Sequence, residues 1–250
     1  MKINHNTILI TGGGSGIGRA LAEAFHALGN HVIVSGRRQS ALDAVTAANP
    51  GMASLPLDIT DAASIRAFAE RVVRDHPALN VVIHNAGIMR NEDVTAAPAF
   101  LEDAEATVVT NLLGPIRLSA ALLPHLQRQP ASTILTVSSG LAFVPLAATP
   151  TYCATKAAIH AYSIALRLQL QATSVEVIEI VPPYVRTGLQ GEHQASDPRA
   201  MPLDAFIGEV MSLLGQPGPE IVVERCKPLR FAAESGRMAE MVALLNATEH

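Results

Sequence analysis

Short runs rich in valine and isoleucine alternate along this chain with longer segments of helical character. Because the runs are apolar at successive positions, the strands they predict would be covered on both faces, as in a parallel sheet between helices. Strands are expected at 7–11, 31–35, 54–57, 81–84, 133–137, 175–181 and 220–225. Helices are expected at 19–28, 40–48, 62–75, 100–126, 151–171, 203–214 and 232–245. This alternation predicts an α/β fold with a single doubly wound, Rossmann-type parallel sheet of about seven strands and helices on both faces.

The length and composition favour one domain with a large core. The chain has 250 residues, and no linker rich in glycine, serine or proline divides it. We therefore expect a single domain over 1–250, with the polar segment near 188–205 serving as a lid over a substrate. Hydrophobic residues make up 49% and charged residues 16%, which excludes a disordered chain. The net charge of −4 argues against a nucleic-acid partner.

The cysteine count and the N-terminal segment predict a cytoplasmic protein. Cys153 and Cys226 are too few for a disulfide scaffold, so a reducing compartment is expected. The first residues show no secretory signal pattern, and no apolar run of about 20 residues lacks a charge or a proline, so no membrane insertion is expected. The histidines show no close metal-ligand spacing, and no metal is predicted.

A glycine-rich loop follows the first expected strand and precedes a helix. It reads Thr11-Gly12-Gly13-Gly14-Ser15-Gly16-Ile17-Gly18. Gly12, Gly16 and Gly18 have no Cβ, so a pyrophosphate could approach the helix N-terminus, where unpaired N–H groups and the helix dipole favour negative charge. A flexible strand-to-helix turn is the alternative. The strand–loop–helix context favours a dinucleotide site.

The residues after the second and third strands bear on which dinucleotide binds. An acidic residue that would hold the ribose 2′-hydroxyl of NAD is absent, and Gly36 is followed by Arg37 and Arg38. Arginine forks match a phosphate, so the sequence predicts NADP(H), with a pair of solvated surface arginines as the alternative. After the third strand, Asp58 beside Ile59 could accept from the adenine amino group or cap the next helix, and both interpretations stay open.

Tyr152 and Lys156 lie near the start of a long expected helix. Their i, i+4 spacing places the phenol and the ammonium on one face. A nearby positive charge lowers the pKa of a tyrosine, which is ordinarily about 10, and lets it act as general acid and base. The pair by itself also fits an ordinary contact on a helix surface.

Further motifs occur in a fixed order along the chain: Thr-Gly-x-x-x-Gly-x-Gly at 11–18, Asn85-Ala86-Gly87, Asn111, Ser138-Ser139, Tyr152 with Lys156, and 182–187. In this set the chain resembles the short-chain dehydrogenase/reductase family. The opening NTILITGGGSGIG (6–18) and the segment VVERCKPLRFA (222–232) resemble one subgroup of that family, the oxidoreductases of the lipoteichoic-acid D-alanylation operon. Pro182-Pro183 stands where the family usually has Pro-Gly, which stiffens the loop expected beside the nicotinamide.

The resemblance implies a role for each motif residue. Tyr152 resembles the residue that exchanges a proton with a carbonyl or alcohol, and Lys156 the one that lowers its pKa and binds the nicotinamide ribose. Ser139 resembles the donor that orients the substrate oxygen, with Ser138 the weaker candidate. Asn111 resembles the residue that holds a water in the proton relay. The implied cofactor contacts are Gly12, Ser15, Gly16, Ile17, Gly18, Arg37, Arg38, Asp58, Ile59, Asn85, Ala86, Gly87, Tyr152, Lys156, Pro182, Val185 and Thr187.

These observations predict an NADP(H)-dependent oxidoreductase that transfers hydride between nicotinamide and a small carbonyl or secondary alcohol. The same fold could instead hold NADP(H) as a sensor or structural protein without turnover. A serine esterase acting through Ser139 is a weaker alternative, because the Gly-x-Ser-x-Gly elbow lacks its first glycine. The resemblance also implies a homodimer or homotetramer, built on the helices around Asn111 and from Tyr152.

Overall fold

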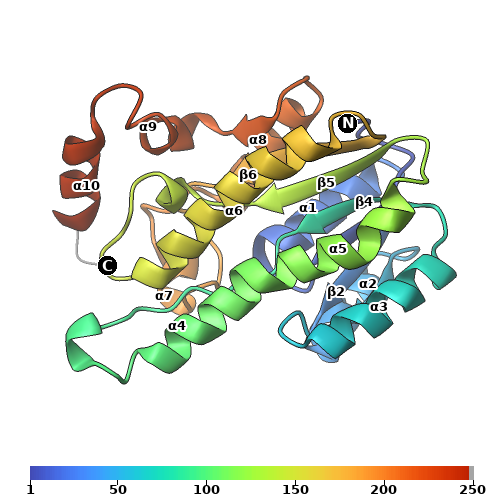
Figure 1. The fold of residues 1–250 in the computed structure, drawn as a ribbon, viewed down its shortest axis with the longest axis horizontal. Coiled ribbons are helices and arrows are strands. Elements are labelled where there is room, and N and C mark those ends of the chain that lie inside the picture. The colour runs from blue at the N-terminus through green and yellow to red at the C-terminus, as the bar shows by residue number, and fades with distance from the viewer. Residues whose placement is uncertain (248–250) are drawn as a thin grey trace.

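Residues 1–247, which the computed structural model describes, contain one sheet of seven strands. Helices cover both faces of this sheet (Figure 1). The strands are β1 (Thr7–Thr11), β2 (His31–Gly36), β3 (Ala53–Pro56), β4 (Leu79–His84), β5 (Ser132–Val137), β6 (Val175–Val181) and β7 (Glu220–Val222). Their spatial order is β3-β2-β1-β4-β5-β6-β7, and every neighbouring pair is parallel. The predicted fold class is confirmed.

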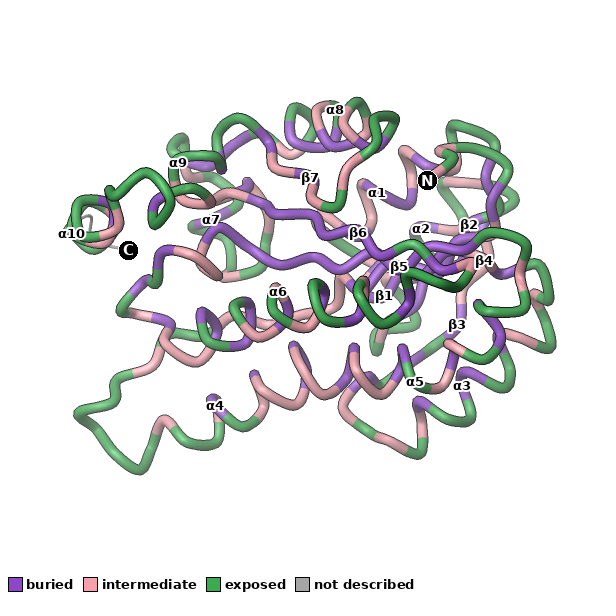
Figure 2. The backbone as a smooth tube through the Cα atoms, turned by 45° about the horizontal axis from the view of Figure 1, so that its top comes forward, coloured by how far each residue is buried: buried purple, intermediate pink, exposed green. Residues whose placement is uncertain are grey.

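The helices form two layers around the sheet. They are α1 (Gly16–Ala27), α2 (Gln39–Ala48), α3 (Ala62–Asp75), α4 (Leu101–Val108), α5 (Gly114–Leu126), α6 (Pro150–Leu170), α7 (Glu192–Ser196), α8 (Leu203–Leu214), α9 (Lys227–Arg230) and α10 (Met238–Ala247). Side chains of α1, α2 and α8 pack in one hydrophobic cluster with the strands, and those of α3, α5 and α6 pack in a second. Burial is therefore concentrated along the strands and on the inner faces of the helices, as Figure 2 shows.

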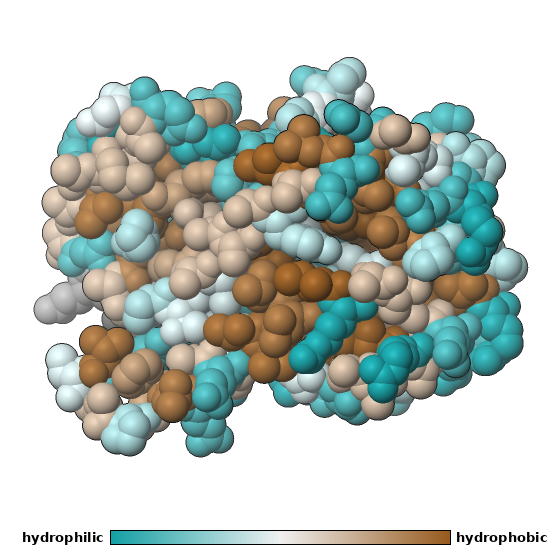
Figure 3. All heavy atoms as spheres, in the orientation of Figure 1, coloured by the Kyte–Doolittle hydropathy of each residue, from teal (hydrophilic) through white to brown (hydrophobic). Residues whose placement is uncertain are grey.

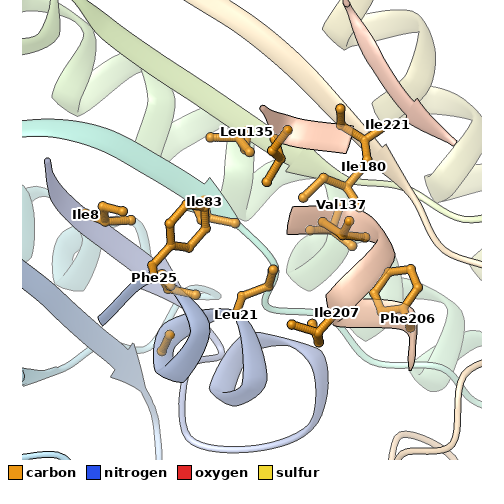
Figure 4. Close-up of a cluster of buried hydrophobic side chains, with 14 of the residues drawn as sticks. Ile8, Leu21, Phe25, Ile83, Leu135, Val137, Ile180, Phe206, Ile207 and Ile221 are labelled. Carbon is orange, nitrogen blue, oxygen red and sulfur yellow. The ribbon is translucent and has the colours of Figure 1, made fainter. Parts of the chain in front are cut away.

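The cluster beneath α1 and α8 shows why these segments are helical. Leu21 and Phe25 of α1 recur one turn apart and are fully buried, as is Phe206 of α8. They meet Ile83 and other apolar side chains of the strands in Figure 4. Burying a side chain of this size contributes about 1.5–3 kcal/mol. Helical periodicity thus places a continuous apolar stripe against the sheet.

Strands β1 to β3 are added toward one edge of the sheet and β4 to β7 toward the other, so the strand order switches between the neighbours β1 and β4. In doubly wound folds the carboxyl ends of the strands beside such a switch point form the ligand crevice. The loops after β1, β4, β5 and β6 carry most of the predicted site residues. The topology therefore brings these separate motifs to one edge of the sheet.

Several element boundaries differ from the predicted ones. α1 begins at Gly16 rather than residue 19, and β7 ends at Val222 because the chain then forms a 3₁₀ turn at Glu224–Cys226. The closing helix spans Met238–Ala247 rather than 232–245. Gly236, with φ of 70°, adopts a left-handed conformation, which separates the closing helix from the turns before it.

The predicted helix 100–126 is interrupted by a π-helical turn at Val109–Leu113, just before Gly114-Pro115. Pro115 has no N–H to donate, which is consistent with a wide turn at this junction. The stretch Leu101–Leu126 has 26 residues, and an 18-residue window within it reaches a mean hydropathy of 1.4, values that a membrane-spanning helix could also have. Leu118, Leu122 and Leu126 are fully buried against the sheet, which accounts for much of this apolar character.

Candidate active site

A cavity of about 430 Å³ lies where the chain leaves β1, β4, β5 and β6. The glycine loop forms one part of its lining, and the first turns of α6 form another. The predicted site residues that line it are Gly12, Ser15, Gly16, Ile17, Arg38, Asn85, Ala86, Gly87, Ser139, Tyr152, Lys156, Pro182, Val185 and Thr187. The structure thus brings together motifs that are spread over most of the chain.

Smaller cavities adjoin the main one at Gly12. One, of about 340 Å³, is lined by Gly36, Arg37 and Arg38, and another, of about 140 Å³, is lined by Arg37 and Ile59. Gly12 lines all three cavities. The resulting series runs from the α6 side chains to the arginines after β2. Its extended shape and its donors fit a dinucleotide with its phosphates at the glycine loop.

The backbone of the glycine loop requires residues without a Cβ. Gly12 and Gly16 have φ of 69° and 52°, in the left-handed region. A Cβ on Gly18 would lie 2.4 Å from the carbonyl oxygen of Gly12 and 2.3 Å from Asn85 Nδ2. Gly18 therefore permits close packing behind the loop rather than lining the cavity. The side chain of Ser15 makes no capping hydrogen bond at the α1 N-terminus, which leaves that end suited to an anion.

The turn after β4 is tied to the end of β1. The backbone N–H groups of Asn85 and Ala86 each donate to Thr11 Oγ1 at 3.1 Å. Asn85 Nδ2 donates to the carbonyl oxygen of Thr11 at 3.0 Å. These bonds fix the Asn85-Ala86-Gly87 turn beside the glycine loop.

Tyr152 and Lys156 share one face of α6, as predicted from their spacing. Lys156 Nζ lies 5.5 Å from the centroid of the Tyr152 ring. It donates to the carbonyl oxygen of Val137, at the end of β5, at 2.8 Å. Both side chains are buried, although both line the cavity. Ser139 Oγ accepts a hydrogen bond from the N–H of Leu141 at 3.1 Å, which orients the hydroxyl after β5.

Burial disfavours the charged form of both α6 groups. It raises the pKa of Tyr152, while hydrogen bonding with Ser139 acts in the lowering direction. Burial lowers the pKa of Lys156 to about 8, with the negative charge of Glu179 acting against the decrease. For Tyr152 the net direction is opposite to the one expected from Lys156 alone. The reason is that loss of water around a buried phenolate outweighs the other contributions.

Asn111 lies in the π-helical turn and not in the cavity lining. Its Nδ2 donates to the carbonyl oxygen of Ile88 at 2.8 Å, and its Oδ1 accepts from the N–H of Ile88 at 2.9 Å. Nδ2 also donates to Thr155 Oγ1 on α6, at 3.3 Å. Asn111 thus connects the loop after β4 to the helix of Tyr152. Its role in holding a water stays a prediction.

Asp58 does not cap the helix that follows it, so that alternative is wrong. Its carboxylate accepts from the N–H and hydroxyl of Thr60 at 2.9 and 2.7 Å, and these bonds lower its pKa. The cap of α3 is Asp61, whose side chain accepts from the N–H of Ala63 at 2.8 Å. The contact of Asp58 with adenine stays a prediction. Its neighbour Ile59 lines the smallest of the three cavities.

Residues outside the predicted catalytic and cofactor set also line the main cavity. They are Val137, Pro183, Ser138, which is the weaker serine candidate, and Gly188, Leu189 and Gln194 of the segment expected to act as a lid. Gln194 is 4% exposed, and its Nε2 donates to the carbonyl oxygen of Val185 at 2.8 Å. It belongs to α7, a helix too short to show any periodicity in sequence. The segment expected to act as a lid therefore contributes cavity-lining residues.

Comparison with known proteins agrees with this arrangement. A profile of the family described as short chain dehydrogenase matches residues 6–198. The chain is 40% identical over 238 residues to the Bacillus subtilis (strain 168) protein called uncharacterized oxidoreductase DltE, with 94% of each chain covered.

Two solved structures show the same fold. A short chain dehydrogenase from Burkholderia cenocepacia in complex with NADP has a TM-score of 0.85 and 24% identity, covering 98% of this chain and 100% of that one. A short chain dehydrogenase/reductase from Burkholderia phymatum in complex with NAD has a TM-score of 0.80 and 20% identity, covering 100% and 99%. From the matching profile and the relative of similar length, we conclude that the chain belongs to the short-chain dehydrogenase/reductase family of oxidoreductases and resembles its DltE subgroup.

Proposed function

We propose that this protein is an NADP(H)-dependent oxidoreductase that transfers hydride between nicotinamide and a small molecule carrying a carbonyl or a secondary alcohol. The observation that supports this most directly is the shared cavity of Ser139, Tyr152 and Lys156 with the glycine loop. The nicotinamide supplies the hydride chemistry when it is bound, while the protein supplies binding, orientation and proton transfer.

Each side chain of the shared cavity has a distinct task in the proposed reaction. Tyr152 donates its hydroxyl proton to the substrate oxygen during reduction, or receives a proton from the alcohol during oxidation. Ser139 donates a hydrogen bond to the same oxygen and orients it. The ammonium of Lys156 favours the phenolate that forms on Tyr152 and binds the ribose hydroxyls. Because the tyrosine and the lysine are buried, their mutual attraction is little weakened by water.

The arginines after β2 support NADP(H) rather than NAD(H). Arg37 lines both outer cavities, and Arg38 lines the main cavity and the larger outer one. Gly36 stands where an acid would bind the ribose 2′-hydroxyl. Guanidinium groups match a phosphate by charge and by geometry. The fold alone does not distinguish NADP(H) from NAD(H), because one of the two structural neighbours described above holds NADP and the other holds NAD.

We further propose a cytoplasmic homodimer or homotetramer. Cys153 and Cys226 are both buried free thiols, which is consistent with a reducing compartment. Ile164 and Leu168 of α6 are 38% and 62% exposed. In Figure 3 hydrophobic residues also gather over α5 on the face turned to the viewer. A two-fold contact through these helices would cover this surface.

NADPH oxidation with a panel of aldehydes and ketones tests the proposed reaction. We expect turnover with at least one carbonyl compound, and NADP⁺ reduction with the matching alcohol. A protein that binds NADPH tightly but oxidises it with no member of a broad panel would instead be the silent binder. An ester panel without nucleotide tests the esterase alternative. No described residue lining the cavity of Ser139 is a histidine that could serve as its base.

A further inference from the structure

A buried carboxylate lies behind the α6 site, outside the cavity lining. Glu179 of β6 has an exposed fraction of 0%. It is in register with Thr136 of β5, whose Oγ1 lies 2.7 Å from Ser163 Oγ of α6. Side chains at these paired positions therefore face α6. Glu179 Oε2 lies 2.8 Å from Nδ1 of His160, which is also on α6.

Lys156 lies one turn before His160 on the same helix, so both side chains are on the face that packs against β5 and β6. Lys156 Nζ donates to the carbonyl oxygen of Val137 at 2.8 Å, and Val137 follows the residue paired with Glu179. The Glu179 carboxylate acts to raise the pKa of Lys156. Its other oxygen, Oε1, is buried and has no hydrogen-bond partner among the described residues.

We propose that Glu179 is a positioning residue for the active-site lysine: its buried carboxylate supplies the negative charge that keeps Lys156 an ammonium beside Tyr152. An unpaired ammonium in a dry interior loses its proton readily, because desolvation disfavours the charged form. A fixed opposite charge nearby counteracts this loss. Glu179 does not line the cavity, so it acts through Lys156 rather than on a substrate or cofactor.

The other charged groups near Glu179 are His160, Glu220 and Arg230, and they bear on whether its charge acts on Lys156. Glu220 of β7, Glu179 and His160 have ligand atoms within 4.8 Å of one another. Arg230 of α9, however, donates to both carboxylate oxygens of Glu220, at 2.7 and 3.1 Å, and also binds Glu234. The guanidinium therefore already neutralises that side of the cluster, where a metal ion would otherwise fit. Among the described residues Glu179 pairs directly only with His160, and the Lys156 ammonium, one turn earlier on α6, experiences its charge without a direct ion pair.

The consequence for turnover rests on the proposed function, but the charge state of Lys156 can be measured without turnover. The chain contains three lysines, Lys2, Lys156 and Lys227. Incorporation of lysine labelled with ¹³C at Cε therefore gives few NMR signals, and Lys156→Arg identifies the signal of interest. The pKa of Lys156 is then read from the chemical shift as a function of pH in the full-length protein.

In Glu179→Gln we expect the pKa of Lys156 to fall, since the variant removes the opposite charge that counteracts desolvation of the ammonium. The amide keeps the size of the side chain, and circular dichroism confirms the fold. Glu176→Gln on the same strand is the matched control. Its carboxylate is 47% exposed and pairs with the N-terminal amine, so Lys156 should titrate as in the unmodified protein. In Glu179→Asp, which keeps a carboxylate, the pKa of Lys156 should return toward its value in the unmodified protein.

Unchanged titration of Lys156 in Glu179→Gln would overturn the proposal. If that variant does not fold, the unmodified protein still tests the proposal, because a Lys156 that is neutral at pH 7 overturns it. In a turnover assay the alkaline limb of kcat should move to lower pH in Glu179→Gln by the same interval. A protein without any dehydrogenase activity would contradict the proposed function, while the lysine titration would still test Glu179.

Discussion

Tyr152 and Lys156 are each placed where a single charge is unfavourable. Burial raises the pKa of the phenol and lowers that of the ammonium, so neither ionises readily without a partner of opposite charge. The backbone carbonyl of Val137 and the carboxylate of Glu179 provide negative potential around Lys156. In the proposed reaction, proton transfer by Tyr152 would therefore depend on the groups that keep its neighbour Lys156 charged.

Replacing Tyr152 with phenylalanine removes the proposed proton donor while keeping the ring. We expect turnover to fall by about 10²- to 10⁴-fold, the usual contribution of general acid–base catalysis, with NADPH affinity nearly unchanged. Steady-state kinetics and fluorescence titration of NADPH measure the two effects. Tyr162→Phe, on the same helix but outside the cavity lining, is the control and should keep its turnover. Near-normal activity of Tyr152→Phe would exclude the mechanism.

Replacing Arg37 with glutamine tests the cofactor preference. A lost charged hydrogen bond costs about 1.5–3 kcal/mol, which corresponds to roughly 10- to 150-fold in affinity. The unmodified protein should therefore bind NADPH at least about tenfold more tightly than NADH, and Arg37→Gln should erase most of that ratio. Arg38→Gln should have a smaller effect, and the exposed Arg66→Gln none. Equal binding of NADH and NADPH by the unmodified protein would show that these arginines are only surface charges.

His84 predicts an acid-sensitive stability. It is fully buried, its Nε2 lies 2.8 Å from Ser119 Oγ, and burial lowers its pKa to about 4. The unfolded chain gains this proton near pH 6.5, whereas the folded one does so only near pH 4, so proton uptake favours unfolding between these values. At about 1.4 kcal/mol per unit, the loss of unfolding free energy is about 3 kcal/mol.

Urea denaturation of the wild type and of His84→Asn from pH 7 to pH 4 measures this contribution. The variant should lose less stability over the interval, whatever its stability at neutral pH. The exposed His193→Asn should follow the wild type. A slope in His84→Asn as steep as that of the wild type would assign the acid sensitivity to other groups.

At the scale of elements, the glycine loop and α1 depend on the contact behind Gly18. In Gly18→Ala the new Cβ would meet the carbonyl oxygen of Gly12 at 2.4 Å, so the loop or the turn at Asn85 must move. We expect NADPH binding to be lost or greatly weakened, as measured by titration. Gly208→Ala on the exposed side of α8 is the matched control, because its Cβ meets nothing within 4 Å. It should bind NADPH normally and stabilise the helix by about 0.5–1 kcal/mol.

At the scale of the whole molecule, the exposed apolar face of α6 predicts self-association. Leu168 is 62% exposed, and a glutamate there would place a charge in the proposed contact between subunits. Light scattering of the unmodified protein at micromolar concentration should give a dimer or tetramer, and Leu168→Glu should shift it toward the monomer. Leu244→Glu changes a residue of α10 that is 61% exposed and should leave the assembly intact. A monomeric wild type would contradict this prediction.

Signals between nearby residues were enough to predict much of the fold and of the site. The alternation of apolar runs and helical segments predicts the parallel sheet, because side-chain periodicity is a local property. The glycine loop and the spacing of Tyr152 and Lys156 are local as well. The errors lie where local signals compete. Asp58 has the chemistry of a cap but bonds Thr60, and the closing helix begins only after the left-handed Gly236.

The sequence by itself therefore determined the fold class, the family and the positions of the motifs. The tertiary structure alone decided which distant side chains share a buried environment. Glu179 and His160 are 19 positions apart and meet only because β6 lies beside β5 under α6. Gln194 likewise reaches the cavity only because its segment folds back over the carboxyl end of the sheet. Desolvation, which sets the pKa directions of Tyr152 and Lys156, depends on everything packed around a group, and no short stretch of sequence specifies it.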